Sequence, residues 1–166
     1  MRLSPRLEAL LNRCQPGFPL WDLCCDHGYL GLQALHSGAF TEVLFNDTAP
    51  HLLALVKAKL QGGESARLIS GKAEEISEPL TGNIVIAGVG AEKIFNILDA
   101  HLQRGTLIGP HILVCPETDT DWLVDQSLKG LELVEKVSIP HNHNLRWILR
   151  YAVLPNKKGT ESGTLN

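Results

Sequence analysis

Residues 20–31 read LWDLCCDHGYLG. A short apolar run ends in an acid and two cysteines, breaks into a polar turn, and resumes with the spacing of a helix. A strand, a tight turn and a helix in this order are typical of the place where an open α/β sheet binds a nucleotide-like ligand. Small residues in such a turn let backbone N–H groups approach the ligand closely. The stretch therefore predicts the first strand and the first helix of an α/β sheet, with a ligand site between them.

The composition of the chain is that of an ordinary globular protein. The 166 residues are 44% hydrophobic and 20% charged, and a chain of this length predicts one domain, which we expect over residues 1–154. Residues 155–166 are polar and rich in Gly, Ser and Thr, which predicts a disordered tail. The apolar runs are too short to span a bilayer and no signal-peptide pattern is present, so we expect a cytoplasmic protein with reduced cysteines and no membrane contact. The net charge of −3 gives no overall attraction to nucleic acid, so an RNA partner would need a local basic patch or a second chain.

Strands and helices alternate along the rest of the chain. Apolar patterns predict strand–helix units up to a helix over residues 118–128, with the clearest strand at residues 83–88. Two strands, 131–139 and 145–154, then follow with no helix between them. The alternation predicts an α/β, doubly wound, mostly parallel and Rossmann-like sheet of seven strands, and the closing hairpin requires an antiparallel strand. This ending resembles class I S-adenosylmethionine-dependent methyltransferases, in which the last strand inserts antiparallel beside the fifth.

Residues suited to S-adenosylmethionine follow three of the expected strands. Asp47 ends the second strand and is placed to accept the ribose hydroxyls, although an Asp there is also a common helix cap. Asp22 and the turn over residues 24–28 can hold the methionine part, because a carboxylate suits positive sulfonium and ammonium groups. A second glycine-bearing turn, Gly88-Val89-Gly90-Ala91, follows the fourth strand and can bring backbone groups close to the methyl. Together these turns predict a cofactor site at one edge of the sheet.

Five matches in order along the chain carry a resemblance to one family. They are Arg6-Leu7-Glu8-Ala9, the run from Asp22 to Leu30, Asp47, Gly88-Val89-Gly90-Ala91 and Cys115-Pro116-Glu117. With them the chain resembles the TrmK family of bacterial tRNA adenine-N1-methyltransferases from about Ser4 to Tyr151. The Asp26-His27-x-Tyr29-Leu30 run is the most specific match, to Asp-His-Ala-Tyr-Leu-Pro in the family. The resemblance implies a class I methyltransferase fold, S-adenosylmethionine as the cofactor, and an adenosine in tRNA as the substrate.

The sequence also departs from the family pattern. Cys24 stands in place of the first glycine of the motif, Gly28 in place of the alanine, and Gly31 in place of the proline. Lys72 lies in the third-strand turn, where the family has an Asp that can bind the cofactor adenine. The later turns read Gly-Val-Gly-Ala for Gly-Met-Gly-Gly and Cys-Pro-Glu for Gln-Pro-Asn. The family usually carries a C-terminal coiled-coil extension that helps grip tRNA, and the printed sequence ends soon after the last expected strand.

The resemblance and the turns together give the predicted site. Adenine N1 already carries a lone pair, so methyl transfer needs alignment more than deprotonation, and a carboxylate can stabilise the cationic product. Asp26 is the first candidate for this carboxylate, with His27 either orienting it or contacting the cofactor. The candidate catalytic residues are Asp26, His27 and Glu117; the candidate cofactor-binding residues are Asp22, Cys24, Asp26, Gly28, Asp47, Thr48, Lys72, Ala73 and Gly88; and the candidate substrate contacts are Arg6, as a phosphate or carboxylate clamp, Tyr29 and Gly90.

Other interpretations of these residues stay open. Cys24 to His27 have metal-ligand chemistry, but adjacent side chains at a strand end point to opposite sides, so no metal site is predicted. We expect His141 and His143 to belong to a polar hairpin loop over residues 140–144. The altered turns support one alternative: a cofactor-binding module that has lost catalysis and acts as a partner or regulator. A nicotinamide-dependent oxidoreductase would need a cleaner Gly-x-Gly-x-x-Gly turn and usually a separate substrate domain.

Overall fold

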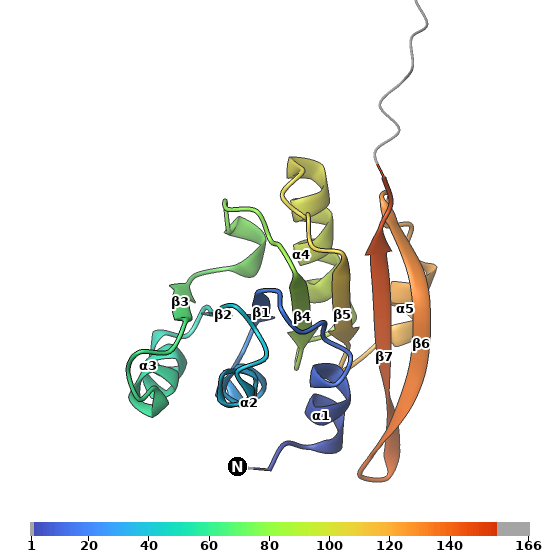
Figure 1. The fold of residues 1–166 in the computed structure, drawn as a ribbon. Helices are drawn as coiled ribbons and strands as arrows, with labels where there is room; N and C mark the ends of the chain where they lie inside the picture. Colours follow the sequence, from blue (N-terminus) through green and yellow to red (C-terminus); the bar gives the residue numbers. More distant parts are fainter. Residues whose placement is uncertain (1, 156–166) are drawn as a thin grey trace, which may run out of the picture.

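The computed structural model describes residues 2–155, which form one seven-stranded sheet with helices on both faces (Figure 1). The helices are α1 (Pro5–Leu11), α2 (Tyr29–Ser37), α3 (Pro50–Lys59), α4 (Ala91–Arg104) and α5 (Thr120–Asp125), with a 3₁₀ helix η1 (Ala73–Glu75). The strands are β1 (Leu20–Leu23), β2 (Val43–Asp47), β3 (Ala66–Ser70), β4 (Asn83–Ala87), β5 (His111–Cys115), β6 (Leu131–His141) and β7 (Asn144–Val153). Apart from its first residue, the tail predicted over residues 155–166 lies outside the described residues.

The strand order confirms the predicted fold class. The strands run β3-β2-β1-β4-β5-β7-β6 across the sheet. Strands β1 to β5 are parallel, and β7 lies antiparallel between β5 and β6. The chain therefore builds the sheet outward from β1 in one direction and from β4 in the other. Such a reversal between two neighbouring parallel strands leaves a crevice at their carboxyl ends, which is where open α/β sheets bind ligands.

Buried side chains form two cores, one on each face of the sheet. Helices α1, α2 and α3 pack over one face through residues that include Leu10 and Val56. Helices α4 and α5 cover the other face through residues that include Ile94 and Leu123. A parallel sheet needs cover on both faces, which explains why its central strands read as continuous apolar runs.

A buried asparagine joins the start of β4 to the segment that leads into β1. The Asn83 side chain is fully buried and donates from Nδ2 to the backbone oxygens of Gln15 and Pro19, at 2.9 and 3.1 Å. Its Oδ1 accepts from the Gln15 N–H at 2.7 Å. One side chain thus bonds three backbone groups of the loop, and the Pro19 oxygen also accepts from the Asn83 backbone N–H at 2.9 Å.

Two predicted boundaries are wrong. The helix predicted over residues 118–128 spans only Thr120–Asp125, because Asp119 is left-handed, with φ 56°, and Gln126 is already extended. The hairpin loop predicted over residues 140–144 contracts to Asn142 and His143, and His141 belongs to β6. Asn142 has a φ of 54°, a left-handed conformation that asparagine tolerates better than most residues and that suits a two-residue hairpin turn.

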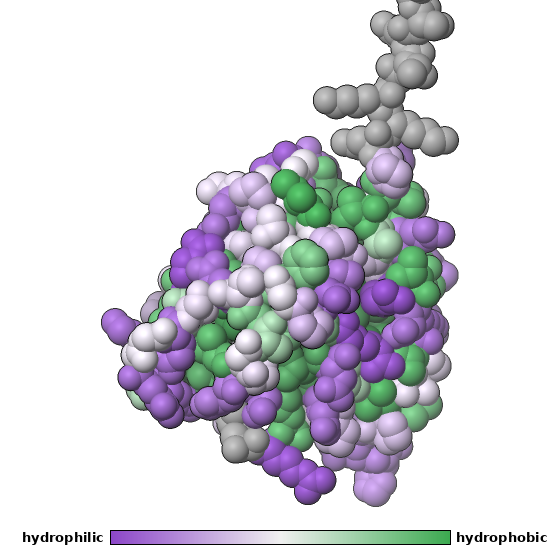
Figure 2. Space-filling model, in the orientation of Figure 1, coloured by the Kyte–Doolittle hydropathy of each residue, from purple (hydrophilic) through white to green (hydrophobic). Residues whose placement is uncertain are grey.

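Some large hydrophobic side chains reach the surface. Phe18, Ile108 and Leu145 are exposed, and Figure 2 shows both hydrophobic and hydrophilic residues on one face of the molecule. Single exposed apolar residues of this kind are common on globular proteins. Within residues 2–155, no helix combines the length and the apolar character needed to cross a membrane.

Candidate functional site

A cavity of about 900 Å³ lies at the carboxyl ends of β1, β2 and β4. Its walls come from the turns after these strands, from the segment after β3, from the loop after β5 and from the N-terminal residues. The predicted site residues that line it are Arg6, Asp22, Cys24, Asp26, His27, Tyr29, Asp47, Thr48, Ala73, Gly88 and Glu117. The structure therefore brings most of the predicted residues together around one space, whereas Gly28, Lys72 and Gly90 are not part of its lining.

The turn after β1 coils through three left-handed residues. Cys24, Asp26 and Gly28 have φ values of 55°, 51° and 68°. A Cβ on Gly28 would lie 2.6 Å from Val56 Cγ2, so this position takes only glycine. At Cys24 and Asp26 the same conformation costs about 1–2 kcal/mol each, which the rest of the fold must offset. Strain of this kind is typical of backbone held in place for a ligand.

Asp22 ends up almost completely buried beneath this turn. Its Oδ2 accepts a hydrogen bond from the Gly31 N–H at 3.0 Å. Burial raises the pKa of Asp22 to about 7, against the lowering effect of the Gly31 hydrogen bond and with a smaller contribution from the charge of Asp47. Near neutral pH the carboxyl group is therefore poised between its neutral and charged forms, and a cation in the cavity would favour the charged form.

The glycine at position 31 has a local explanation. Gly31 lies in α2, and a Cβ there would collide with the ring of Phe45, which is fully buried. A proline at this position would also lack the N–H that binds Asp22. Glycine in place of the family's proline thus fits the contacts that Gly31 makes with Asp22 of β1 and Phe45 of β2.

Asp47 connects the ends of β1 and β2. Its Oδ2 accepts from the Asp26 N–H at 2.9 Å, and its Oδ1 accepts from the Ala49 N–H at 2.9 Å, just before α3. The contact with Ala49 closes a turn just before the helix; α3 has Ala49 as its N-cap and no side-chain cap hydrogen bond, so the helix-cap interpretation of Asp47 is wrong. Each carboxylate oxygen can accept a second hydrogen bond, and Asp47 lines the cavity, so a ribose hydroxyl can also be accommodated.

Contacts link three residues of the turn after β1 and the start of α2, namely Asp26, His27 and Tyr29. His27 Nδ1 lies 2.8 Å from Asp26 Oδ1, and the His27 and Tyr29 rings stack with centroids 5.5 Å apart and an angle of 9°. Lys59 Nζ lies 4.8 Å from the centre of the Tyr29 ring. His27 thus holds the Asp26 carboxylate from one side, as an orienting residue would, while Tyr29 supports the imidazole.

Two arginines hold the loop after β5 on the opposite wall. Arg6 Nη1 lies 3.8 Å from Glu117 Oε1, and Arg146 Nη1 donates to the Glu117 backbone oxygen at 2.6 Å. The Glu117 N–H in turn donates to the oxygen of Val89 in the turn after β4. Among the partners that residues 2–155 offer, none hydrogen-bonds the buried Nε atom of Arg6 or of Arg146. Arg146, from β7, thus holds the loop that carries Glu117, although it is not itself part of the cavity lining.

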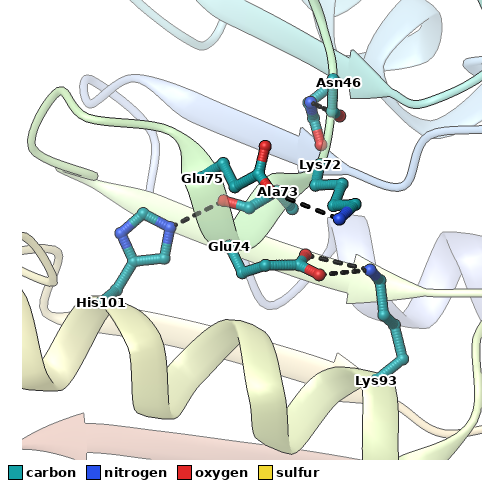
Figure 3. Close-up of polar contacts among 8 residues, drawn as sticks. Asn46, Lys72, Ala73, Glu74, Glu75, Lys93 and His101 are labelled. Atoms are coloured by element: carbon teal, nitrogen blue, oxygen red, sulfur yellow. Dashed lines mark hydrogen bonds and ion pairs between the residues drawn. The ribbon is translucent and has the colours of Figure 1, made fainter.

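Two glutamates of the segment after β3 pair with lysines in different surroundings (Figure 3). Lys93, from the first turn of α4, lies 2.8 and 2.9 Å from the two carboxylate oxygens of Glu74 and lines the cavity. Lys72 lies 3.3 Å from Glu75 Oε1, and both of those side chains are exposed. The lysine that faces the cavity is therefore Lys93, which the sequence analysis missed, and not Lys72.

The same segment is tied to the core by buried polar side chains. Asn46 Nδ2 donates to the backbone oxygens of Ile69 and Gly71, at 3.0 and 2.9 Å. His101 is fully buried, and its Nε2 lies 2.8 Å from the Ala73 oxygen, an atom that can only accept (Figure 3). Nε2 therefore carries the proton, and Nδ1 accepts from the Thr106 hydroxyl at 2.7 Å. Burial lowers the pKa of His101 and favours this neutral form.

Several residues of the cavity wall gave no usable signal in the sequence. Lys93 follows Glu92 at the start of an amphipathic helix, where charged residues are common, and its partner Glu74 is 19 positions away. His141 also lines the cavity from the end of β6, although the sequence suggested only a polar loop. Over residues 2–155, no three His, Cys, Asp or Glu side chains are grouped so that they could hold a metal ion, and the four cysteines are free.

Comparison with known proteins places this fold. Residues 3–138 match the family model described as a methyltransferase domain. No curated protein sequence matches the chain. The match covers β1 to β5 and most of β6, and so it includes every residue that lines the cavity except Arg2 and His141.

Solved structures share the fold at low sequence identity. The B. subtilis m1A22 tRNA methyltransferase TrmK superposes with a TM-score of 0.77 and 18% identity, over 92% of this chain and 67% of that one. M. capricolum TrmK, solved with S-adenosylhomocysteine, gives 0.72 and 18%, over 92% and 70%. The N-methyltransferase NodS from Bradyrhizobium japonicum gives 0.71 and 12%, over 89% and 85%. At these identities the likeness establishes the architecture, and enzymes with different names share it.

Proposed function

This chain belongs to the methyltransferase-domain family, and we propose that it transfers the methyl group of S-adenosylmethionine to N1 of an adenosine in tRNA. The observation that carries the proposal is the single cavity that collects Asp22, Asp26, Asp47 and Gly88 at the switch point of the sheet. We place the activity in the cytoplasm, where tRNA is available.

The residues around the cavity fit this cofactor. A volume of about 900 Å³ lies within the range of roughly 300–1,000 Å³ that is usual for ligand sites. Asp47 can accept the ribose hydroxyls, and Asp22 offers a carboxylate to the positive groups of the methionine part. Ala73, which is buried, adds an apolar group to the cavity wall from η1. When bound, S-adenosylmethionine supplies a methyl group on a positively charged sulfur.

Asp26 is the residue best placed to act on the methyl acceptor. Its carboxylate is exposed at the cavity mouth and is held from one side by His27 Nδ1. A carboxylate fixed in this way can accept a hydrogen bond from the adenine amino group and stabilise the positive charge that develops on the ring. His27 then acts as a positioning residue, because its Nδ1 contacts the Asp26 carboxylate.

The choice of tRNA rests on two supports. Structures with the same fold include enzymes named as m1A22 tRNA methyltransferases, and the run from Asp26 to Leu30 resembles the signature of that family. Arg2 and Arg6 line the side of the cavity formed by the N-terminal residues, where cationic side chains can contact phosphate groups. The net charge of −3 means that this local attraction, and not the whole molecule, would have to hold the RNA.

A transfer assay tests the proposal. Purified protein is incubated with radiolabelled S-adenosylmethionine and undermodified tRNA, and the tRNA nucleosides are then analysed for 1-methyladenosine. The expected result is label in 1-methyladenosine for the unaltered protein, and about a hundredfold slower transfer for Asp26→Asn. Asp99 on α4 is half-buried and does not line the cavity, so Asp99→Asn gives the control, which should leave the rate unchanged. Cofactor binding without transfer to any tRNA would instead favour a module that has lost catalysis.

A further inference from the structure

The cavity wall contains a positive charge whose presence needs an explanation. Lys93 reaches the cavity from the first turn of α4 and pairs with both oxygens of Glu74 in η1 (Figure 3). The two side chains are 35% and 24% exposed, so solvent screens the pair less than it would a pair on the open surface. The ammonium group of Lys93 is therefore held at the cavity wall by its contacts with Glu74.

An unpaired ammonium group would oppose the binding of S-adenosylmethionine. The cofactor carries a positive sulfur, and like charges in a partly enclosed cavity repel each other over distances of about 10 Å. The charge of Lys93 reaches the turn after β1, where it opposes the effect of burial, which raises the pKa of the Cys24 thiol to about 11. That turn is the part of the wall to which we assign the methionine end of the cofactor.

Acidic partners face two of the three Arg and Lys side chains that line the cavity, and Arg2 is the third. Arg6 lies 3.8 Å from Glu117, and Lys93 lies 2.8 Å from Glu74. Asp47 accepts only backbone N–H groups, so its negative charge is not cancelled by a cationic side chain within hydrogen-bond distance in the described part of the chain. Four acidic side chains line the cavity against Arg2, Arg6 and Lys93, so Glu74, by neutralising Lys93, makes the cavity more negative toward a ligand.

We propose that Glu74 sets the charge preference of the cavity by neutralising Lys93, so that S-adenosylmethionine binds in preference to its product, S-adenosylhomocysteine. The two ligands differ by a methyl group and by the positive charge on sulfur, while their adenosine and amino-acid parts are the same. Glu74 is thus a specificity-determining residue that acts through Lys93. The inference rests on the proposed function, because it takes S-adenosylmethionine as the ligand.

A second pair in the same segment provides a matched comparison. Lys72 and Glu75 are also a lysine and a glutamate, 3.3 Å apart, but their side chains are 59% and 67% exposed and neither lines the cavity. Replacing Glu75 changes the net charge of the protein by the same amount as replacing Glu74. Any effect that comes only from net charge, or from this segment in general, will therefore be the same in both variants.

The test is a set of dissociation constants for the two ligands, measured by calorimetry at low and at physiological ionic strength. For Glu74→Gln we expect the ratio of the S-adenosylmethionine to the S-adenosylhomocysteine constant to rise about tenfold, the size expected for one charge about 10 Å away. For Lys93→Met the ratio should fall, because Glu74 is then unpaired. For the double variant, Glu74→Gln with Lys93→Met, the ratio should return close to that of the unaltered protein. Glu75→Gln should leave the ratio unchanged.

Each outcome decides between two explanations. If Glu74→Gln weakens both ligands equally, or if Lys93→Met shifts the ratio in the same direction, the pair is structural and the proposal is overturned. If Glu74→Gln does not fold, two other variants still test the proposal. The ratio should fall for Lys93→Met, and it should stay close to that of the unaltered protein for the double variant. If the unaltered protein binds neither ligand, the proposed function itself fails, and that result is distinct from an unchanged ratio.

Discussion

The carboxyl group of Asp22 is enclosed by the turn that follows its own strand. Its position after an apolar run was readable from the sequence, and so was its proximity to a ligand site. Its burial was not readable, because that depends on how Gly31 packs against Phe45 of the neighbouring strand. The conversion of an ordinary aspartate into a group with a pKa of about 7 is therefore a property of the folded turn.

The pKa of Asp22 predicts that cofactor binding releases protons. Below about pH 7 part of the free protein carries a protonated Asp22, and a cationic ligand favours the charged form, so affinity for S-adenosylmethionine should rise with pH up to about 7 and then level off. Calorimetry at pH 6.5 in two buffers with different ionisation enthalpies should give different binding heats. Asp22→Asn keeps an oxygen acceptor for the Gly31 N–H and should remove the difference. Equal heats for the unaltered protein in both buffers would contradict the assignment.

At the scale of elements, the contact between α2 and β2 depends on one glycine. Gly31 lets the helix approach the buried ring of Phe45, and no larger side chain fits without moving that ring. The sequence showed a glycine where the family has a proline, but not the reason, since Phe45 is 14 positions away on another strand. Packing across the sheet was the missing information.

Gly31→Ala should lower the free energy of unfolding by about 1–3 kcal/mol, the usual cost of overpacking a core. Urea unfolding measures this change. Phe45→Leu removes part of the ring, so the double variant should lose less stability than the sum of the two single variants. Strictly additive losses would show that the ring does not limit the approach of the helix.

The link between η1 and α4 should make stability depend on pH. His101 is buried in its neutral form, and burial lowers its pKa below that of the unfolded chain. As pH falls below about 6.5, the unfolded state takes up a proton that the folded state refuses, so stability falls. Urea unfolding at pH 7 and pH 5 should show a smaller loss for His101→Gln, which keeps a donor for the Ala73 oxygen. Because Asp22 has the opposite dependence in this range, only the difference between the two proteins isolates His101, and parallel losses would rule the effect out.

At the scale of the whole molecule, the alternation of strands and helices and the closing hairpin were readable from the sequence, and the structure confirms both. The pattern of apolar residues carries this information because it reflects which faces of each element are buried. The pairing of Lys93 with Glu74, and the position of His141 beside the cavity, were not readable. They depend on which loops lie side by side in the folded protein. The identity of a single residue in a polar segment does not indicate its neighbours in space. The assignments of individual residues to cofactor, acceptor and RNA stay predictions.

The connection between the two halves of the sheet can be tested at Asn83. This fully buried side chain makes three hydrogen bonds to the loop that leads into β1. Asn83→Ala should lower the free energy of unfolding by about 1–3 kcal/mol, because the N–H and the oxygen of Gln15 lose their side-chain partner, whereas the Pro19 oxygen keeps its bond from the backbone N–H of residue 83. The exposed Asn12 at the end of α1 gives a control, Asn12→Ala, with a change of about 0.5 kcal/mol or less. A similar small change in both variants would show that water replaces the lost partners.

The insertion of β7 between β5 and β6 has a consequence for folding during synthesis. The fully buried Val114 of β5 pairs with Leu149, and Ile112 pairs with Tyr151, so these partners of β5 come after more than 140 residues have left the ribosome. Until then β5 presents an open, apolar edge, which is the kind of surface that joins other chains into aggregates. A nascent chain stalled before residue 144 should therefore depend on chaperones, whereas one released after residue 153 can close the sheet by itself.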